Sequence, residues 1–376
     1  MKITVIGGGP AGLYFALLMK KHDPAHEITV IERDGPNDTF GWGIVFSDQT
    51  FDYLRENDEP SFEAITAACE TWDNVDIVHR GERITVRGNN FSGIARLRFL
   101  TILQDRCREL GVDLRFRQVV DDLAALPAHD LLVGADGANS FVRRARHDLF
   151  GPAVTHGRNK YIWLGTPRLF HGLTLTFVTH ETGVYAAHSY KFDGQASTFI
   201  VECSEATWEA AGFATMTGEE TCALLQGIFA AALDGHPLLT KDFVRWLNFP
   251  LVRNASWYGE RVVLLGDALH TAHFSIGSGT KLALEDAIAL AAAFREHAAP
   301  DAALPAFAAA RRPRVEQLQQ AAMDSLRWFE HMGDYMHLEP LPFALEAMTR
   351  SNRVDLDKLR RRDPDFVARV LAETRR

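Results

Sequence analysis

Six consecutive residues near the start of the chain, Gly7-Gly8-Gly9-Pro10-Ala11-Gly12, fit the pattern G-x-G-x-x-G. In this pattern the first glycine permits a tight turn, the second lets backbone N–H groups approach a pyrophosphate, and the third lets a helix pack closely against a strand. Glu32 follows 20 residues after Gly12, where a carboxylate can accept a hydrogen bond from a ribose 2′-OH. The predicted dinucleotide contacts are Gly7, Gly9, Pro10, Ala11, Gly12, Glu32 and Arg33.

This pattern alone suits both FAD and NAD, and two further motifs favour FAD. The string Gly266-Asp267-Ala268 follows an apolar run, and an aspartate at the tip of a strand can accept hydrogen bonds from the ribityl hydroxyls of a flavin. The helix that follows would aim its N-terminal amides at the pyrimidine edge of the ring system and stabilise negative charge there. The predicted contacts in this region are Gly266, Asp267, Gly277, Gly279 and Thr280.

The other motif runs from Asp136-Gly137 to Arg143, where a strand meets a helix. Its aspartate has two interpretations: it contacts the ligand, or it caps the following helix. We include Asp136 and Arg143 among the predicted FAD contacts.

The elements that position these motifs follow from hydrophobic periodicity. Residues 2–7 and 28–32 are short apolar strands and residues 10–22 are a helix, which together predict a βαβ unit with parallel strands. A helix is predicted over 96–110 and strands over 112–116, 130–135 and 261–266. Residues 33–60 are polar and rich in glycine, and we expect a long ligand-binding loop there.

The pattern changes after Gly151, where four strands at hairpin spacing (161–165, 173–178, 184–190 and 197–202) predict a mixed or antiparallel sheet. Helices are predicted over 205–210, 218–233, 281–297 and 302–332, with breaks at Pro305 and Pro313. The fold class is therefore α/β. A Rossmann-like FAD-binding domain (1–150 and 255–300) is interleaved with a substrate domain (151–254, with 75–95 as an alternative addition), and C-terminal helices follow (301–376).

Composition limits the classes of function. The formal charge of -9 argues against nucleic acid as a partner, because phosphate backbones require a basic face. The four cysteines form no C-x-x-C pair, and His270 and His273 have no neighbouring carboxylate pattern, so we expect no metal. No apolar run approaches a signal peptide or a membrane span. We expect a cytoplasmic monomer or homodimer.

Taken together, the three motifs resemble the class A flavoprotein monooxygenases, the para-hydroxybenzoate-hydroxylase-like family, in order and spacing over nearly the whole chain. Arg96 is similar to the family's flavin-contacting arginine. Phe274 and Lys281 depart from the proline and asparagine usual at these places. The resemblance implies that NADH or NADPH reduces FAD, that O2 then forms a C4a-hydroperoxyflavin, and that an activated aromatic ring is hydroxylated.

Within the family, several strings resemble the aryl-CoA hydroxylases that act on salicylyl-CoA or 2-aminobenzoyl-CoA. They are Gly41-Trp42-Gly43, Tyr161-Ile162-Trp163, Tyr190-Lys191-Phe192 and His273-Phe274-Ser275. The 376 residues leave no room for the second flavin domain of the 2-aminobenzoyl-CoA enzyme. The resemblance therefore implies a CoA thioester such as salicylyl-CoA, 5-hydroxylated to gentisyl-CoA. Its phosphates would lie against Arg158, Lys160 or the basic stretch that begins at Arg350.

A base or hydrogen-bond partner for the substrate phenol would raise the electron density of the ring, and His188, Tyr190 and His273 are the candidates. Trp42, Trp163, Phe199 and Phe274 could line an aromatic pocket, although residues of this kind are more often core residues. Three alternatives remain: hydroxylation of a free aromatic acid or of an indole such as tryptophan, flavin-dependent halogenation, which the absence of a W-x-W-x-I-P string disfavours, and a flavin redox sensor without turnover.

Overall fold

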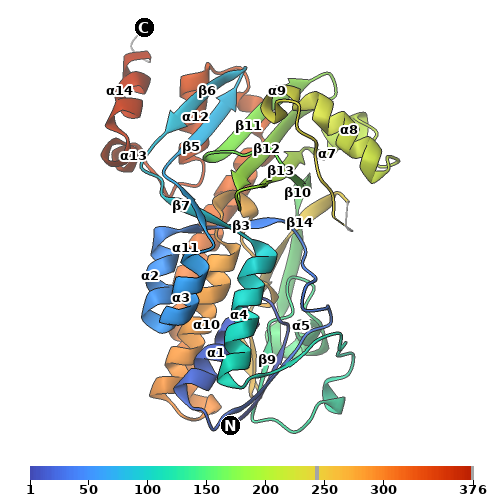
Figure 1. Ribbon diagram of the computed structural model, residues 1–376, viewed down its shortest axis with the longest axis vertical. Coiled ribbons are helices and arrows are strands. Elements are labelled where there is room, and N and C mark those ends of the chain that lie inside the picture. The colour runs from blue at the N-terminus through green and yellow to red at the C-terminus, as the bar shows by residue number, and fades with distance from the viewer. Residues whose placement is uncertain (242–244, 374–376) are drawn as a thin grey trace.

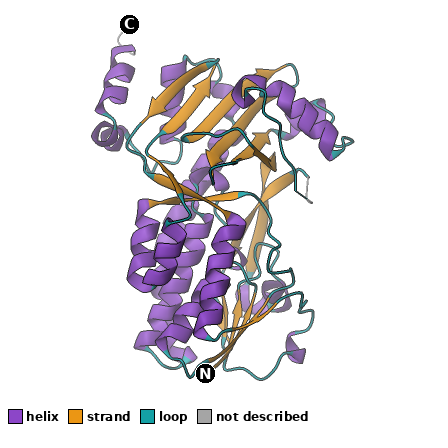
Figure 2. Ribbon diagram, in the orientation of Figure 1, coloured by secondary structure: helices purple, strands orange, loops and turns teal. Residues whose placement is uncertain are grey.

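The computed structural model describes residues 1–241 and 245–373. They form two tiers along the long axis of the molecule, with the N-terminus at the outer end of one tier and the C-terminus at the outer end of the other (Figure 1). Figure 2 shows that each tier has its own sheet and its own set of helices. This arrangement confirms the predicted α/β class.

The first tier contains a six-stranded sheet in the order β15-β16-β9-β1-β2-β8. Its central strands are apolar and β-branched, which suits a sheet covered on both faces, and all neighbours except β15 and β16 pair in parallel. The strands are β1 (Lys2–Ile6), β2 (Glu27–Ile31), β8 (Asp113–Arg115), β9 (Leu131–Gly134), β15 (Tyr258–Gly259) and β16 (Val262–Leu264). The tier's main helices are α1 (Pro10–His22), α4 (Arg96–Leu110) and α10 (Gly279–Glu296).

The second tier contains a seven-stranded sheet in the order β14-β10-β13-β12-β11-β5-β6, in which only β11 and β5 pair in parallel. Residues 75–86 thus join the strands that follow Gly151. The strands are β5 (Val75–His79), β6 (Glu82–Val86), β10 (Pro152–Thr166), β11 (Leu173–His180), β12 (Gly183–Lys191), β13 (Ser197–Cys203) and β14 (Leu247–Asn254). The helices beside this sheet are α7 (Glu205–Ala210), α8 (Gly218–Ile228), α9 (Ala230–Leu233), α12 (Pro340–Thr349), α13 (Leu356–Arg362) and α14 (Pro364–Glu373).

Between the tiers lies a three-stranded sheet, and here the prediction of a long loop over residues 33–60 was wrong. That segment contains β3 (Gly43–Ser47) and α2 (Asp48–Asn57). α2 buries only Thr50, Phe51 and Leu54, so its apolar face is too narrow to show in the sequence. The neighbouring elements are β4 (Glu70–Trp72), β7 (Phe91–Ala95) and α3 (Glu59–Thr66), and the short helices α5 (Phe141–Ala145) and α6 (His147–Phe150) follow β9.

The 31-residue helix α11 (Pro300–Glu330) connects the tiers. Arg311 pairs with Asp286 of α10, whereas the amide of Gln319 donates to the carbonyl of Val252 in β14. The breaks expected at Pro305 and Pro313 do not occur. Both prolines are exposed, so the carbonyls that lose a helical N–H partner can reach water while the opposite face packs. The helix predicted over 218–233 is instead divided at Phe229 into α8 and α9.

Among the described residues, no helix has the length and apolar character needed to cross a bilayer.

Candidate active site

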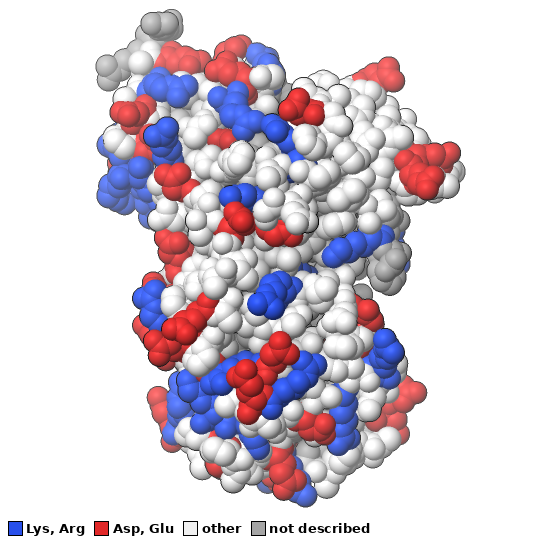
Figure 3. All heavy atoms as spheres, viewed as in Figure 1, with Lys and Arg blue, Asp and Glu red and all other residues white. Residues whose placement is uncertain are grey.

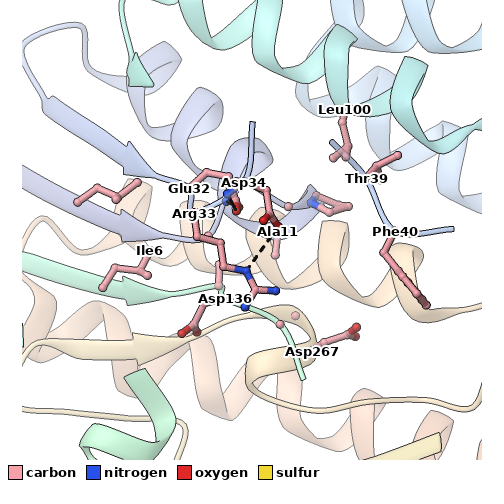
Figure 4. A pocket seen from close by; sticks show the side chains of 18 of the residues that line it. Ile6, Ala11, Glu32, Arg33, Asp34, Thr39, Phe40, Leu100, Asp136 and Asp267 are labelled. Atoms are coloured by element: carbon pink, nitrogen blue, oxygen red, sulfur yellow. Dashed lines mark hydrogen bonds and ion pairs between the residues drawn. The ribbon is translucent and has the colours of Figure 1, made fainter. Parts of the chain in front are cut away.

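A cavity of about 510 Å³ opens at the carboxyl edge of the six-stranded sheet, where β1 separates β2 from β9. Such an edge is the usual ligand site of an open α/β sheet. Figure 4 shows Glu32 and Asp267 in its wall. Most of the predicted cofactor contacts line this cavity: Gly7, Gly9, Pro10, Ala11, Glu32, Arg33, Arg96, Asp136, Gly266, Asp267, Gly279 and Thr280.

The glycines of the loop at residues 7–12 have distinct geometric roles. A Cβ atom on Gly7, whose φ is +109°, would lie 2.2 Å from the carbonyl oxygen of Ala135, and one on Gly12 would lie 2.1 Å from that of Gly7. A Cβ atom on Gly9 or Gly279 would meet no protein atom within 4 Å. Gly12 therefore permits close packing of α1 on β1, whereas Gly9 and Gly279 leave open space at the beginnings of α1 and α10.

Glu32 directly follows β2 and has both carboxylate oxygens fixed. One oxygen accepts the backbone N–H of Gly8 at 2.6 Å, and the other accepts that of Asp34 at 2.9 Å. The carboxylate is therefore held beside the glycine loop, where an adenosine ribose would lie. Arg33 is exposed at the cavity, and its Nε atom lies 3.5 Å from Oδ2 of Asp34.

Asp267 and Arg96 both line the cavity; Asp267 is exposed to the open cavity and Arg96 is half-buried. Desolvation by the surrounding protein raises the pKa of the Asp267 carboxyl, and the charge of Arg96 opposes this shift. Burial likewise lowers the pKa of Arg96, and Asp267 opposes it. The Nε–H of Arg96 donates to the hydroxyl of Thr39 at 3.1 Å. The two side chains thus place a carboxylate and a guanidinium at the same end of the cavity.

Asp136 caps α5 while lining the cavity, which combines both interpretations of its motif. Its Oδ2 atom accepts the backbone N–H of Phe141 at 2.6 Å. Arg143 does not line the cavity. Its guanidinium donates to the carbonyls of Ala138 and Ala268, which joins two cavity loops. Gly277 also lies outside the cavity wall, in a turn with a φ of +60°.

On the other tier, His188 and His273 converge on a carboxylate that sequence reasoning missed. The Nε2 atom of His188 lies 3.2 Å from Oε2 of Glu202, and the Nε2 atom of His273 lies 3.9 Å from Oε1. Alternation along β12 and β13 places His188 and Glu202 on the face of the sheet that also carries Tyr161. The sequence did contain one indication of this residue, because Glu202 is the only charged residue in the predominantly apolar strand 197–203.

Tyr190, the third candidate base, lies apart from these histidines. Its hydroxyl donates to the carbonyl of Gly43 at 2.8 Å, and burial raises the pKa of Tyr190 to about 12. Burial lowers the pKa of His273 to about 4, so this imidazole is neutral near pH 7.

The predicted aromatic residues separate into two groups. Phe274 contacts His188 with ring centroids 5.2 Å apart and Tyr161 at 5.0 Å, so it lies beside the histidine pair. Trp163 contacts Phe40, which lines the cofactor cavity, at 5.7 Å. Trp42 lies over Gly165, where a Cβ atom would be 2.6 Å from the indole.

Phe199 is a core residue and does not line the aromatic pocket, which is the second of the two interpretations given for it. It is fully buried on the opposite face of the sheet and contacts Phe229 at 5.3 Å.

The cationic residues predicted to bind the CoA phosphates differ in whether their side chains already have partners within the protein. Lys160 pairs with Glu205 at 3.3 Å, and Arg350 is turned inward onto Ser275 and Ser325. Arg158 is exposed and lines an open depression of about 890 Å³ with Trp246. Acidic and basic side chains are interspersed over the face seen in Figure 3. Within the described residues, no group of three or more His, Cys, Asp or Glu side chains could hold a metal ion.

Comparisons with known proteins agree with this site. Residues 93–322 match the family model described as FAD binding domain. The chain is 43% identical to salicyloyl-CoA 5-hydroxylase of Streptomyces sp over 98% of this chain and 73% of the relative. It is 35% identical to protodeoxyviolaceinate monooxygenase of Chromobacterium violaceum over 92% of this chain and 93% of the relative.

A third relative is 3-hydroxy-4-methyl-anthranilyl-[aryl-carrier protein] 5-monooxygenase of Streptosporangium sibiricum, 36% identical over 89% of this chain and 90% of the relative. Among solved structures, the tetrameric form of 2-methyl-3-hydroxypyridine-5-carboxylic acid oxygenase aligns with a TM-score of 0.72 at 19% identity, covering 96% of this chain and 97% of the other. That likeness shows the same fold.

The glycine loop, Glu32 and Asp267 therefore line a cavity that fits FAD, in a chain whose relatives are monooxygenases of aromatic compounds. The protein is an FAD-dependent enzyme that belongs to the class A aromatic monooxygenases, the para-hydroxybenzoate-hydroxylase-like family.

Proposed function

We propose that the enzyme hydroxylates an aryl-CoA thioester with NAD(P)H and O2, and that its substrate is salicylyl-CoA, converted to gentisyl-CoA by 5-hydroxylation. The observation that carries this proposal is the 43% identity to salicyloyl-CoA 5-hydroxylase over 98% of the chain. A second relative is named for an aryl group carried on a protein, so two of the three relatives above act on a carried aryl group.

The chain's own residues would hold FAD along the cavity, with Glu32 at the ribose and the amides of α10 beyond Asp267. Bound FAD supplies the redox chemistry: it takes a hydride from NAD(P)H and activates O2. The protein supplies orientation and a site that excludes water. Phe274, His188 and Tyr161 form an aromatic wall between the flavin tier and the substrate sheet, suited to a planar ring.

A phenol in this site needs an acceptor for its O–H, because a hydrogen-bonded or ionised phenol makes the ring a better nucleophile. His188 on this wall and the adjacent His273 carry ring nitrogens that can accept a hydrogen bond. Burial raises the pKa of Tyr161 to about 12, so this phenol stays protonated, and the hydroxyl of Tyr190 is already bonded to Gly43. The acceptor role therefore falls to the histidine pair.

The test is a side-by-side assay of the holoenzyme with salicylyl-CoA, salicylyl-pantetheine, free salicylate and tryptophan. NADH consumption, peroxide and hydroxylated product are measured together, because flavin enzymes of this kind can oxidise NADH without hydroxylation. We expect stoichiometric product with salicylyl-CoA, less with the pantetheine ester and none with salicylate. Equal product from salicylate and salicylyl-CoA would contradict a thioester specificity.

The relative named protodeoxyviolaceinate monooxygenase favours a second candidate, an indole or another free aromatic compound. Product from tryptophan without product from either thioester would establish that function instead.

Charge reversal of Arg158 tests where the CoA phosphates bind. A higher KM for salicylyl-CoA, with no change in KM for the pantetheine ester, would locate the phosphates at the depression that Arg158 lines.

A further inference from the structure

Glu202 is a carboxylate in the interior of the protein, with 1% of its surface exposed. It accepts a hydrogen bond from the amide of Asn159 at 2.9 Å and one from Nε2 of His188 at 3.2 Å. Burial by itself would raise the pKa of Glu202, but the hydrogen bonds from His188 and Asn159, with attraction to either imidazole when it is protonated, outweigh burial and leave the pKa lowered. Glu202 is therefore ionised at neutral pH.

An ionised carboxylate can only accept hydrogen bonds, which determines the tautomer of His188. In the neutral imidazole the proton therefore lies on Nε2, facing Glu202, and Nδ1 carries the free lone pair. Among the described residues, none forms a hydrogen bond with Nδ1 of His188. The ring therefore offers an acceptor that the protein itself does not use, and it does so beside Phe274.

The opposite side of His273 leads to a half-buried cation, Arg350. Nδ1 of His273 lies 2.7 Å from the hydroxyl of Ser275, which lies 2.7 Å from the hydroxyl of Ser325 in α11. Nε of Arg350 donates to the Ser325 hydroxyl at 3.0 Å, and its Nη2 donates to the carbonyl of Ser275 at 2.7 Å. Hydrogen bonds thus join His273 to Arg350 in a polar chain, and the other nitrogen of His273 faces Glu202 across 3.9 Å, beyond hydrogen-bond distance.

Arg350 has an unusual environment for an arginine. Burial lowers its pKa to about 10, and the charge of Glu202 opposes this shift. No carboxylate of a described residue lies within ion-pair distance of Arg350, whose guanidinium lies 5.3 Å above the ring of Phe329. A half-buried guanidinium without a direct counter-ion adds little to stability, so its contacts to residues 275 and 325 point to a different role.

We propose that Glu202 and Arg350 are positioning residues that hold residues 271–278 between the substrate sheet and the C-terminal helices, so that His188 presents Nδ1 to the phenol of the substrate. Glu202 orients the imidazole, and Arg350 fixes the loop that carries His273 and Phe274. The inference rests on the proposed function for the identity of the substrate, whereas the histidine tautomer and the loop order do not depend on it.

The experiment uses Glu202→Gln, Arg350→Gln and Arg350→Lys in the full-length holoenzyme. Glu209→Gln and Arg314→Gln are the matched controls, because both side chains are exposed and lie outside the polar chain and the proposed CoA site. Three readouts are taken: the ¹⁵N shifts of His188, assigned by comparison with His188→Gln; hydrogen–deuterium exchange of residues 271–278; and hydroxylated product per NADH consumed.

We expect the wild-type His188 to carry its proton on Nε2 and to lose this preference in Glu202→Gln. Arg350→Gln should accelerate exchange in residues 271–278, and Arg350→Lys should restore part of the protection. In both glutamine variants kcat for product should fall about 10- to 100-fold, because misplacement by about 1 Å costs that much, while KM changes little. The controls should match the wild type.

Each readout has an outcome that overturns the proposal. If His188 of the wild type is protonated on Nδ1, the assigned tautomer is wrong. If hydrogen–deuterium exchange of residues 271–278 is unchanged in Arg350→Gln, Arg350 does not fix this loop. If Glu202→Gln does not fold, Ser325→Ala breaks the same chain at its centre and must accelerate exchange in the loop. A wild-type enzyme that hydroxylates no phenol would refute the proposed function, while the tautomer and the exchange would still decide the positioning roles.

Discussion

The carboxylate of Glu32 accepts the backbone N–H of Gly8 at 2.6 Å, so the acidic residue after β2 is bonded directly to the glycine loop that follows β1. This bond fixes the distance between the group that would bind a ribose and the amides that would bind a pyrophosphate.

Replacement of Glu32 by alanine should weaken FAD binding without unfolding the protein. Loss of a charge-assisted hydrogen bond costs about 1.5–3 kcal/mol, so Kd for FAD should rise about 10- to 100-fold. Titration of the apoprotein by flavin fluorescence measures this change. Glu27→Ala, at the exposed start of the same strand, is the control and should bind FAD as the wild type does. Equal affinity of the two variants would remove Glu32 from the binding site.

Alanine at Gly9 and alanine at Gly12 should have opposite consequences. A methyl group on Gly9 meets no protein atom within 4 Å, so the apoprotein should keep its melting temperature while Kd for FAD rises more than about 10-fold. A methyl group on Gly12 would lie 2.1 Å from the Gly7 carbonyl oxygen, so that variant should lose stability before FAD is added. Thermal melts of both apoproteins test the contrast; a destabilised Gly9→Ala apoprotein would contradict it.

Tyr190→Phe should leave hydroxylation largely intact. The hydroxyl of Tyr190 is bonded to Gly43, and burial keeps the phenol protonated, with a pKa of about 12. We expect a loss of about 1 kcal/mol in stability from the missing hydrogen bond. His188→Gln should lower kcat by about 100-fold or more, as removal of a general base does. Similar losses of kcat in the two variants would reinstate Tyr190 as a candidate base.

His273 should make the folded protein less stable at mildly acidic pH. Burial lowers the pKa of His273 to about 4, whereas an unfolded histidine titrates near about 6.5. The unfolded chain therefore binds a proton that the folded protein does not. The stability due to this group is complete above about pH 6.5 and is lost as pH falls towards 4, about 2 kcal/mol of it by pH 5.

Urea denaturation of wild type and His273→Asn at pH 7 and pH 5 isolates this contribution. His26 and His79, whose pKa burial also lowers, contribute equally in both proteins. Glu202, with a pKa lowered from 4.5, contributes below this window. The variant should lose less stability between the two pH values; parallel losses would show that His273 is not responsible.

The cofactor side of the site could be predicted from the sequence because its parts are local. A phosphate-binding turn needs glycines within six positions, and the ribose carboxylate must follow the next strand. Residues 7–12 and Glu32 can therefore be identified from the sequence alone. The bounds of the helix over Arg96–Leu110 could be predicted for a similar reason, since the regular apolar spacing ends at Gly111, which adopts a φ of +85°.

The substrate side could not be predicted in the same way. Glu202, Ser325 and Arg350 are separated by up to 148 positions and have ordinary residue types, so only the folded chain shows that they form one network. The continuous helix α11 was not predicted because the sequence does not show whether a proline is exposed or buried. An exposed proline destabilises a helix less than a buried one does when the opposite face of the helix packs tightly.

The helix α11 has a mechanical consequence for the two tiers. With a rise of about 1.5 Å per residue, its 31 residues extend about 46 Å, and it bonds to α10 in one tier and to β14 in the other. Because Arg311 and Gln319 lie on one uninterrupted helix, a hinge motion between the tiers would have to bend that helix or break one of these contacts. We therefore expect the distance between the two tiers to stay constant when substrate enters and product leaves.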